Sequence, residues 1–349
     1  MQNGHDVNTH PVLARLRLLL GSGWVVGCLL CAGCSSTPPP VEITDSLPQD
    51  GERPAPNDPD VVARRGLNWL AAKQNKDGTW GGPGNRVALT SLATWAFLSR
   101  GETPASDAYG KTVEDGSVFL VKMEDDSNLS LDTRVILVGC LADTYSLTRI
   151  PLVLSCLRKH LAALPSEDLS PWHAYAANSV LFSSVGEDWV RQVVLQIRAA
   201  PPSREAPLLD QASRLLLFDF IDLPEPERTL ELAAVRTLDP SAWRKCERPL
   251  MTAFMLCKAL GGQPSEDRLN WSRDFYPDMY GRQQVRGAVG WWTPSDLGVA
   301  GAKEFAGMSD EESAIYSTAM MIMSCPWTGS RLPSFQKKLS LVAPPASEP

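Results

Sequence analysis

The sequence predicts an all-α fold, an α/α toroid made of about six helical hairpins. Helical periodicity dominates the chain and strand signals are almost absent. From residue 60 onward, pairs of helices recur at a spacing of about 40 residues, which is typical of a repeat array. Within each pair one helix is apolar on most sides and the other has a polar face. Such pairs can close into an inner barrel and an outer ring.

The helical segments are separated by clear breaks, such as Asp77-Gly78, Gly81–Gly84 and Pro201-Pro202. We expect helices near residues 60–75, 86–100, 107–123, 131–146, 150–164, 171–185, 187–200, 206–221, 225–237, 247–260, 265–284 and 310–325. The second helix of each pair is the more apolar one, as in residues 87–98, 208–218 and 250–260. These helices are therefore expected to be buried on most sides, with their partners outside them.

The N-terminus is typical of an export signal. Arg15 and Arg17 precede an apolar run over residues 18–30, which is shorter than the roughly 20 residues that a membrane span needs. Small residues then precede Cys34, and this arrangement resembles the lipobox of bacterial lipoproteins. The resemblance implies a signal peptide over residues 1–33 and lipidation of Cys34. Lipidation of Cys28, an uncleaved anchor and an ordinary secretory signal remain alternatives.

Residues 34–59 are rich in proline and acidic side chains, so they offer little to bury and are expected to act as an extended tether. Ser35 after the lipid site resembles a sorting signal for the outer membrane of a double-membrane bacterium. The folded domain is predicted over residues 60–328, followed by a tail over 329–349. The expected location is the cell envelope, with the domain anchored through the lipid and facing the periplasm.

Composition limits the classes of partner. The net charge is −7 and the chain has no block of basic residues, which argues against nucleic acid as a partner. Five cysteines remain after residue 34, most of them in apolar helical stretches, and their spacing indicates neither a metal site nor a disulfide framework. We expect them to be small buried hydrophobic residues.

Residues 65–80 (RGLNWLAAKQNKDGTW) carry the most informative pattern in the chain. A helix ends near Gln74, a tight turn follows at Asp77-Gly78, and Trp80 comes directly after it. This pattern resembles the Gln-Trp repeat of the squalene cyclase and prenyltransferase superfamily, whose domains are toroids of paired helices. The resemblance implies a terpenoid cyclase-like fold over most of residues 60–325.

A second copy of this pattern occurs in residues 282–292, and Tyr316 lies in a segment that resembles the start of an inner helix in these repeats. We expect Gln74 to bond to helix-end carbonyls or to the next turn, Gly78 to adopt a positive φ, and Trp80 to cover the helix junction. The same roles are predicted for Gln284, Gly290 and Trp291.

The chemistry of the related enzymes is missing. The chain has no Asp-x-Asp-Asp acid motif, no Asp-Asp-x-x-Asp magnesium motif, no zinc triad and no thioester sequence. His160 follows two basic residues and is expected to be exposed, whereas His173 begins an inner helix and could face a central pocket. One histidine does not make a zinc site, so we expect no metal and no cofactor.

Polar and aromatic residues at the starts of the inner helices would converge at one mouth of a toroid. The candidate pocket consists of Asp132, Arg134, Trp172, His173, Tyr175, Asp210, Arg248, Glu311 and Tyr316. Each residue alone is also explained as a helix-start charge or a packing residue.

The sequence therefore favours a non-catalytic lipoprotein that binds an envelope protein, a peptide or a glycan, or serves as a scaffold. The alternative is an enzyme of the cyclase-like superfamily with unfamiliar chemistry at the barrel mouth.

Overall fold

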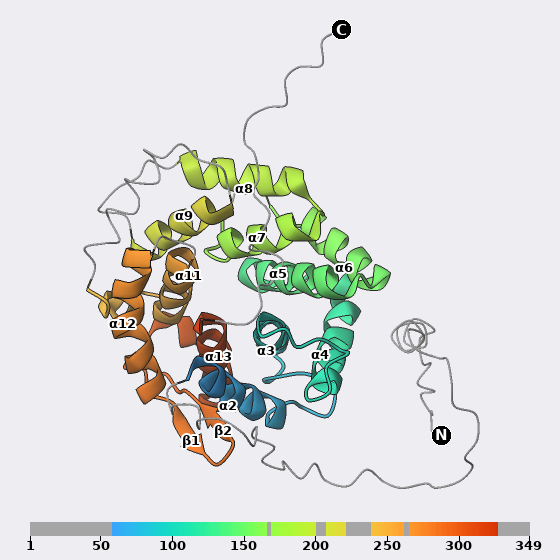
Figure 1. Ribbon diagram of the computed structural model, residues 1–349. Helices are drawn as coiled ribbons and strands as arrows, with labels where there is room; N and C mark the ends of the chain where they lie inside the picture. The colour runs from blue at the N-terminus through green and yellow to red at the C-terminus, as the bar shows by residue number, and fades with distance from the viewer. Residues whose placement is uncertain (1–57, 166–168, 200–206, 221–238, 262–264, 327–349) are drawn as a thin grey trace, which may run out of the picture. The chain divides into compact units, whose positions relative to one another are not determined.

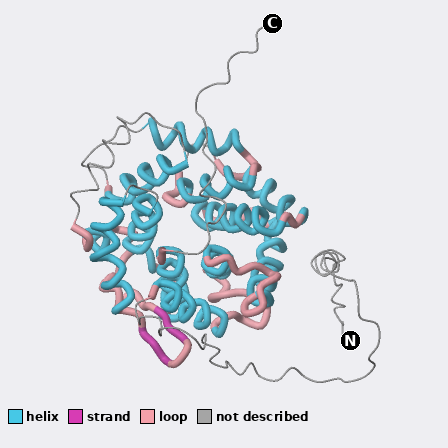
Figure 2. Tube along the Cα trace, in the orientation of Figure 1, coloured by secondary structure: helices cyan, strands magenta, loops and turns pink. Residues whose placement is uncertain are grey.

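The computed structural model describes residues 58–165, 169–199, 207–220, 239–261 and 265–326, and within them the chain is mostly helical with two short strands (Figure 2). The α-helices are α2 (Pro59–Ala72), α3 (Arg86–Ser99), α4 (Gly110–Lys122), α5 (Leu131–Thr148), α6 (Pro151–Ala162), α7 (His173–Ser183), α8 (Glu187–Ala199), α9 (Leu208–Phe220), α11 (Pro249–Gly261), α12 (Ser265–Gly281) and α13 (Asp310–Ser324). Short 3-10 helices are η1 (Met123–Asp125), η2 (Ala242–Lys245) and η3 (Lys303–Phe305). The strands are β1 (Gln284–Arg286) and β2 (Val289–Trp291).

All the predicted helices that fall on these residues are present, which confirms an all-α fold. The predicted helix at 225–237 lies outside the described residues, as do Cys34, the signal at 1–33, almost all of the tether and the tail at 329–349. One boundary was wrong: the helix predicted to reach residue 284 ends at Gly281. An antiparallel hairpin follows it, with Val285 paired with Gly290.

Local sequence signals explain where the helices begin. The Asp58 carboxylate accepts a hydrogen bond from the backbone N–H of Asp60, and Pro59 occupies the first position of α2, where no N–H is needed. Helix α13 begins with a capping box, in which Ser309 and Glu312 bond to each other's backbone N–H groups. The first and the last helix of the described residues are therefore both capped by side chains at their N-termini.

The apolar helices pack on one another in a closed order. Contacts run from α3 to α5, α7, α9, α11 and α13, and α13 in turn packs against α3 (Figure 1). In α3 every residue from Leu89 to Ser99 is buried, and α13 is buried throughout Ser313–Ser324. This burial on all sides is what their apolar composition predicts.

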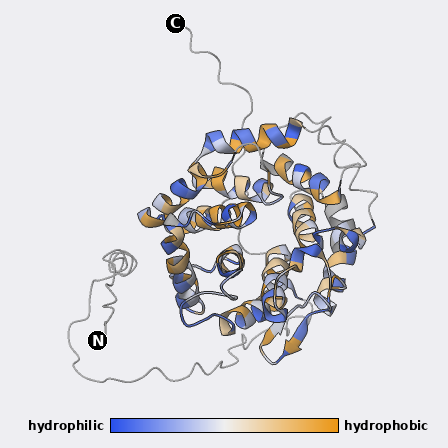
Figure 3. Cartoon of the chain, turned by 180° about the vertical axis from the view of Figure 1, so that it is seen from behind, coloured by the Kyte–Doolittle hydropathy of each residue, from blue (hydrophilic) through white to orange (hydrophobic). Residues whose placement is uncertain are grey.

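The other helices pack against this set and keep one polar face. Helix α2 packs on α13 and α3, α4 on α3, α6 on α5, α8 on α7, and α12 on α11. Helix α8 is a clear case, since Val190, Val193 and Val194 are buried whereas Leu195 is 59% exposed. Figure 3 shows hydrophobic and hydrophilic residues alternating along this helix. The division into apolar and amphipathic helices thus follows the packing.

The first predicted repeat has the expected geometry. Nε2 of Gln74 donates to the carbonyl of Gly78 at 3.0 Å and to the carbonyl of Thr112, in α4, at 2.9 Å. Gly78 has φ of +85°, and a Cβ there would lie 2.6 Å from the Asp115 carbonyl oxygen, so only glycine fits. Trp80 is fully buried, and its indole donates to the Leu70 carbonyl at 2.7 Å.

In the second repeat, the two key residues differ from the predicted ones. The glutamine is one residue earlier in the sequence than predicted, and the tryptophan is one residue later. Gln283, not Gln284, donates to the next amphipathic helix, at the Val62 carbonyl. Trp292, not Trp291, is fully buried.

The bonds of Trp292 repeat those of Trp80. Its indole donates to the Met279 carbonyl at 2.9 Å, and its backbone N–H donates to Thr318 Oγ1 as that of Trp80 does to Thr90. The β-hairpin accounts for this difference. Within it, Gln284 is exposed to solvent, and Trp291 stacks on Trp69 with 6.0 Å between the ring centroids. Gly290 packs against the Gln283 side chain, where a Cβ would lie 2.7 Å from its amide carbon.

Candidate functional site

Aromatic side chains occupy the space between the apolar helices. Tyr175 of α7 lies 4.7 Å from Trp95 of α3 and 4.7 Å from Phe254 of α11, measured between ring centroids. Trp172, just before α7, contacts the rings of both Trp95 and Phe254. All four side chains are buried. The predicted pocket residues Trp172 and Tyr175 therefore belong to the packed interior.

A buried carboxylate, which the sequence analysis missed, borders this aromatic cluster. Asp143 of α5 accepts hydrogen bonds from the Trp95 indole at 2.6 Å and from the Ser179 hydroxyl at 3.1 Å. Burial raises the pKa of Asp143 to about 6, although both hydrogen bonds act to lower it. Lys258 of α11 interacts electrostatically with Asp143, and burial lowers the pKa of Lys258 to about 8. Nothing in its local sequence marks Asp143, because it lies mid-helix among apolar residues.

Two of the predicted mouth residues meet directly. Asp132, in the first turn of α5, pairs with Arg248, just before α11, at 2.5 Å. Helices α5 and α11 are not neighbours in the packing order, because α7 and α9 lie between them in one direction and α3 and α13 in the other. The pair therefore joins the starts of two helices that are distant in this order. Both side chains are about one-third exposed. Two of the predicted pocket residues therefore contact each other.

Tyr316 joins the same region through Glu304, a second residue that the sequence analysis missed. The Tyr316 hydroxyl donates to the Glu304 carboxylate at 2.7 Å, and the backbone N–H groups of Leu250 and Met251 donate to it at 2.9 and 3.0 Å. Glu304 thus caps the N-terminus of α11. Burial raises its pKa. A glutamate in a loop gives no sequence signal for such a cap.

Three predicted residues lie apart from this cluster. Arg134 donates to the Ser127 carbonyl on the surface, and Asp210 is exposed at the start of α9. Glu311 forms an exposed pair with Lys73 at 2.6 Å. These residues lie near helix starts, as predicted. They are apart from the cluster because side chains at a helix start also point toward the flanking helices and solvent.

Both histidine predictions need correction. His160, expected on a polar face, is buried, with Nε2 3.0 Å from the Met123 carbonyl. His173, a candidate for the central pocket for which a packing role was the alternative, is buried with its ring against Trp189, and its Nδ1 accepts from the Ser170 backbone N–H. Burial lowers the pKa of each imidazole. The flanking helices cover these positions, which a single-helix pattern cannot foresee.

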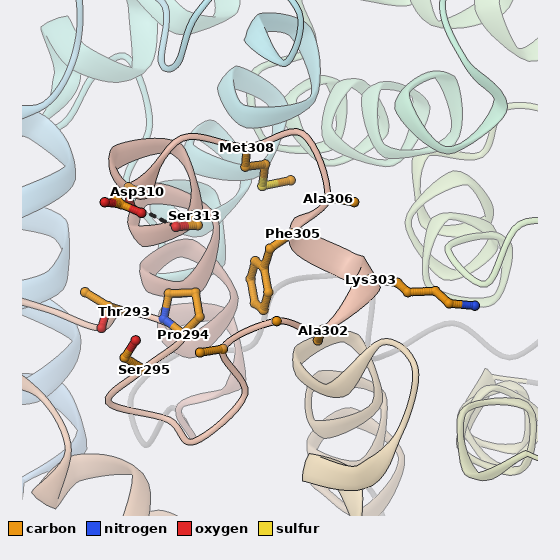
Figure 4. Close-up of a pocket in the computed structure, with 12 residues that line it drawn as sticks. Thr293, Pro294, Ser295, Ala302, Lys303, Phe305, Ala306, Met308, Asp310 and Ser313 are labelled. Atoms are coloured by element: carbon orange, nitrogen blue, oxygen red, sulfur yellow. Dashed lines mark hydrogen bonds between the residues drawn. The ribbon is translucent and has the colours of Figure 1, made fainter.

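An open pocket of about 660 Å³ lies between the loop of residues 293–309 and the start of α13 (Figure 4). Pro294, Phe305 and Met308 supply apolar walls, and Asp310 and Ser313 lie at its polar side. Phe305 packs edge-on against Tyr316, so the pocket adjoins the Glu304 cluster. This volume is within the range of about 300–1,000 Å³ that is typical of ligand sites.

The five cysteines within the described residues are free thiols, four of them buried. In the part of the chain that the structure describes, no group of His, Cys, Asp and Glu is arranged to hold a metal ion, and no helix is long and apolar enough to span a bilayer. Comparison of the chain with models of protein families, with curated proteins and with solved structures finds no match.

Proposed function

We propose that this chain is an envelope-anchored lipoprotein whose helical domain is an α/α toroid of the squalene cyclase and prenyltransferase type, acting as a non-catalytic binding or scaffold module. The closed packing order of the apolar helices supports the toroid. The matching bonds of Trp80 and Trp292 support the repeat relationship.

One observation carries the non-catalytic assignment. In a toroid that cyclises an apolar substrate, the centre must be open, whereas among the described residues the buried rings of Trp95, Trp172, Tyr175 and Phe254 contact one another between α3, α7 and α11. Close-packed interiors leave no room for a substrate of tens of atoms. Binding would then occur at the surface, near the mouth region around Asp132, Arg248 and Glu304.

Two measurements test this proposal. Incubation of the purified protein with squalene or oxidosqualene should give no cyclic product above a heat-killed control. Mass spectrometry of the mature N-terminus should find a lipid on Cys34. Cyclic product would overturn the non-catalytic assignment, and a free amino terminus or a lipid on Cys28 would overturn the assigned anchor.

The second candidate function is an enzyme of the same superfamily, and the buried Asp143 favours it. Acidic groups with strongly raised pKa values are enriched at active sites. If this candidate is correct, Asp143→Asn should abolish a measurable reaction while leaving the fold intact. A screen of envelope extracts for products that depend on the wild-type protein distinguishes the two candidates.

A further inference from the structure

The two copies of the repeat differ in one segment. In the first copy, residues 81–85 connect Trp80 to α3, whereas in the second, residues 293–309 connect Trp292 to α13. The two tryptophans and the two helices are otherwise bonded alike. The long connection is not needed for the repeat itself. Connections longer than about 12–15 residues are uncommon in compact domains and are usually either functional or linker segments.

Several side chains hold this long connection in place. Glu304 ties it to the N-terminus of α11, and Thr293 donates to Asp296 at 2.6 Å within its first turn. At its other end, the backbone N–H of Ser309 donates to Glu312. A loop fixed at its start, middle and end presents a preformed surface, so binding there loses little conformational entropy.

The unpaired charge at the pocket is negative, because the lysine that lines it already forms an ion pair. Lys303 lines the pocket, but its ammonium pairs with Glu247 at 2.8 Å, and in Figure 4 its side chain extends away from Phe305. Among the described residues, none forms a hydrogen bond or ion pair with the Asp310 carboxylate, whose backbone carbonyl accepts from Ser313. Asp310 is exposed at the pocket edge. The pocket therefore combines an apolar wall with an available carboxylate.

We propose that this pocket binds a peptide segment of a partner protein, taking a bulky apolar side chain against Phe305 and Met308 and an adjacent Lys or Arg at Asp310. This inference rests on the proposed binding function and names the chemistry of the partner. The cation would bond to the carboxylate at the pocket edge, which favours a positive charge. An acidic partner would be repelled, because the whole chain carries net charge −7.

The test uses the full-length protein purified in detergent and a phage-displayed library of random hexapeptides. Enriched peptides should contain Phe, Trp, Leu or Met next to Lys or Arg. Calorimetry of the best capped peptide should show about tenfold weaker binding to Asp310→Asn, as expected when a charge-assisted hydrogen bond is lost. Glu311→Gln is the matched control, because Glu311 is the next residue and already pairs with Lys73. It should change the affinity less than twofold. Thermal melting confirms that both variants are folded.

Three results would overturn the assignment: no enrichment over a blank surface, enriched peptides that lack a cation, or equal effects of the two variants. Failure of the proposed binding function can be distinguished from failure of the pocket assignment. If the wild-type protein captures envelope components and Asp310→Asn captures them equally, binding occurs elsewhere and only the pocket assignment falls. If neither captures anything and no peptide binds, both proposals fall.

Discussion

Trp80 and Trp292 each close a junction between an amphipathic helix and the apolar helix that follows. Each indole donates to a carbonyl at or near the end of the preceding helix, Leu70 or Met279, which also accepts from a backbone N–H. Each backbone N–H donates to a threonine in the next helix. The side chain thus fills the junction and bonds through its indole N–H, so its loss removes apolar packing and one buried hydrogen bond.

We predict that Trp80→Ala and Trp292→Ala each lower the free energy of unfolding by about 3–5 kcal/mol through lost burial and a new cavity. Trp291→Ala is the matched control and should cost much less, because Trp291 is only partly buried, although it stacks on Trp69. Urea unfolding of the three variants provides the comparison. Equal losses for Trp291 and Trp292 would contradict the role assigned to Trp292.

Asp143 couples the fold to pH. The carboxyl loses its proton near pH 3.8 in the unfolded chain and near pH 6 in the folded one. Between these values the folded state binds more protons than the unfolded state, so stability from this group falls as pH rises from about 4 to 6. The corresponding change is about 3 kcal/mol.

We predict that Asp143→Asn removes this pH dependence, so its stability relative to the wild type rises between pH 4 and 6. The difference between the two proteins is the quantity to measure, because the buried His160 and His173, whose pKa values are lowered, act in the opposite direction in both. Unfolding curves at several pH values check this. A constant difference across the range would show that Asp143 does not titrate in the folded state.

At the scale of elements, close approach of helices depends on small residues. Gly139 of α5 faces Trp95 of α3, and a Cβ there would lie 2.2 Å from the indole ring. The indole is itself held by Asp143 from the same helix, so it has little freedom to move away. The packing of α5 on α3 therefore requires glycine at this position.

We predict that Gly139→Ala destabilises the protein by up to about 2 kcal/mol, the overpacking cost of about 1–3 kcal/mol less the roughly 1 kcal/mol that alanine contributes to a helix. Gly281→Ala at the end of α12 is the control, because no heavy atom lies within 4 Å of its Cβ position. This control should be neutral or slightly stabilising. Thermal melting compares the two variants, and a stable Gly139→Ala would mean that α3 and α5 can move apart.

At the scale of the whole molecule, stability depends on the last apolar helix meeting the first. Helix α13 packs against α11 on one side and α3 and α2 on the other, and its residues Ser313–Ser324 are all buried. Lys73 and Gly82, near the N-terminus of the domain, contact Glu311 and Glu312 at its start. Residues far apart in sequence therefore complete the domain core.

We predict that truncation after residue 309, which removes α13, abolishes cooperative unfolding, because it exposes the apolar faces of α3 and α11. Truncation after residue 328 removes only the predicted tail and should leave the melting temperature within about 2 °C of the parent, the shift expected for a change below 0.5 kcal/mol. Calorimetry of both truncations tests this. A cooperative transition in the shorter chain would show that the remaining helices form an independent core.

The sequence by itself determined which segments are helical and which of them are buried, because periodicity and turn residues act over short distances. The first repeat could be predicted in detail for the same reason, because Gln74, Gly78 and Trp80 lie within seven consecutive residues. The prediction was wrong by one residue at each position of the second repeat because a hairpin separates Gln283 from Trp292. Its first strand is exposed throughout and its second is only partly buried, and a helical pattern does not indicate this change.

Only the tertiary structure decided the candidate site. Asp143 and Glu304 became evident from partners on other helices, Trp95 and Tyr316, and no local pattern marks such contacts. The tertiary structure likewise shows that His173 and Trp172, both candidates for the pocket, are buried packing residues. The physical reason is that a helix sequence shows which face is buried but not what lies against it, and a binding site is made by the groups that several elements bring together.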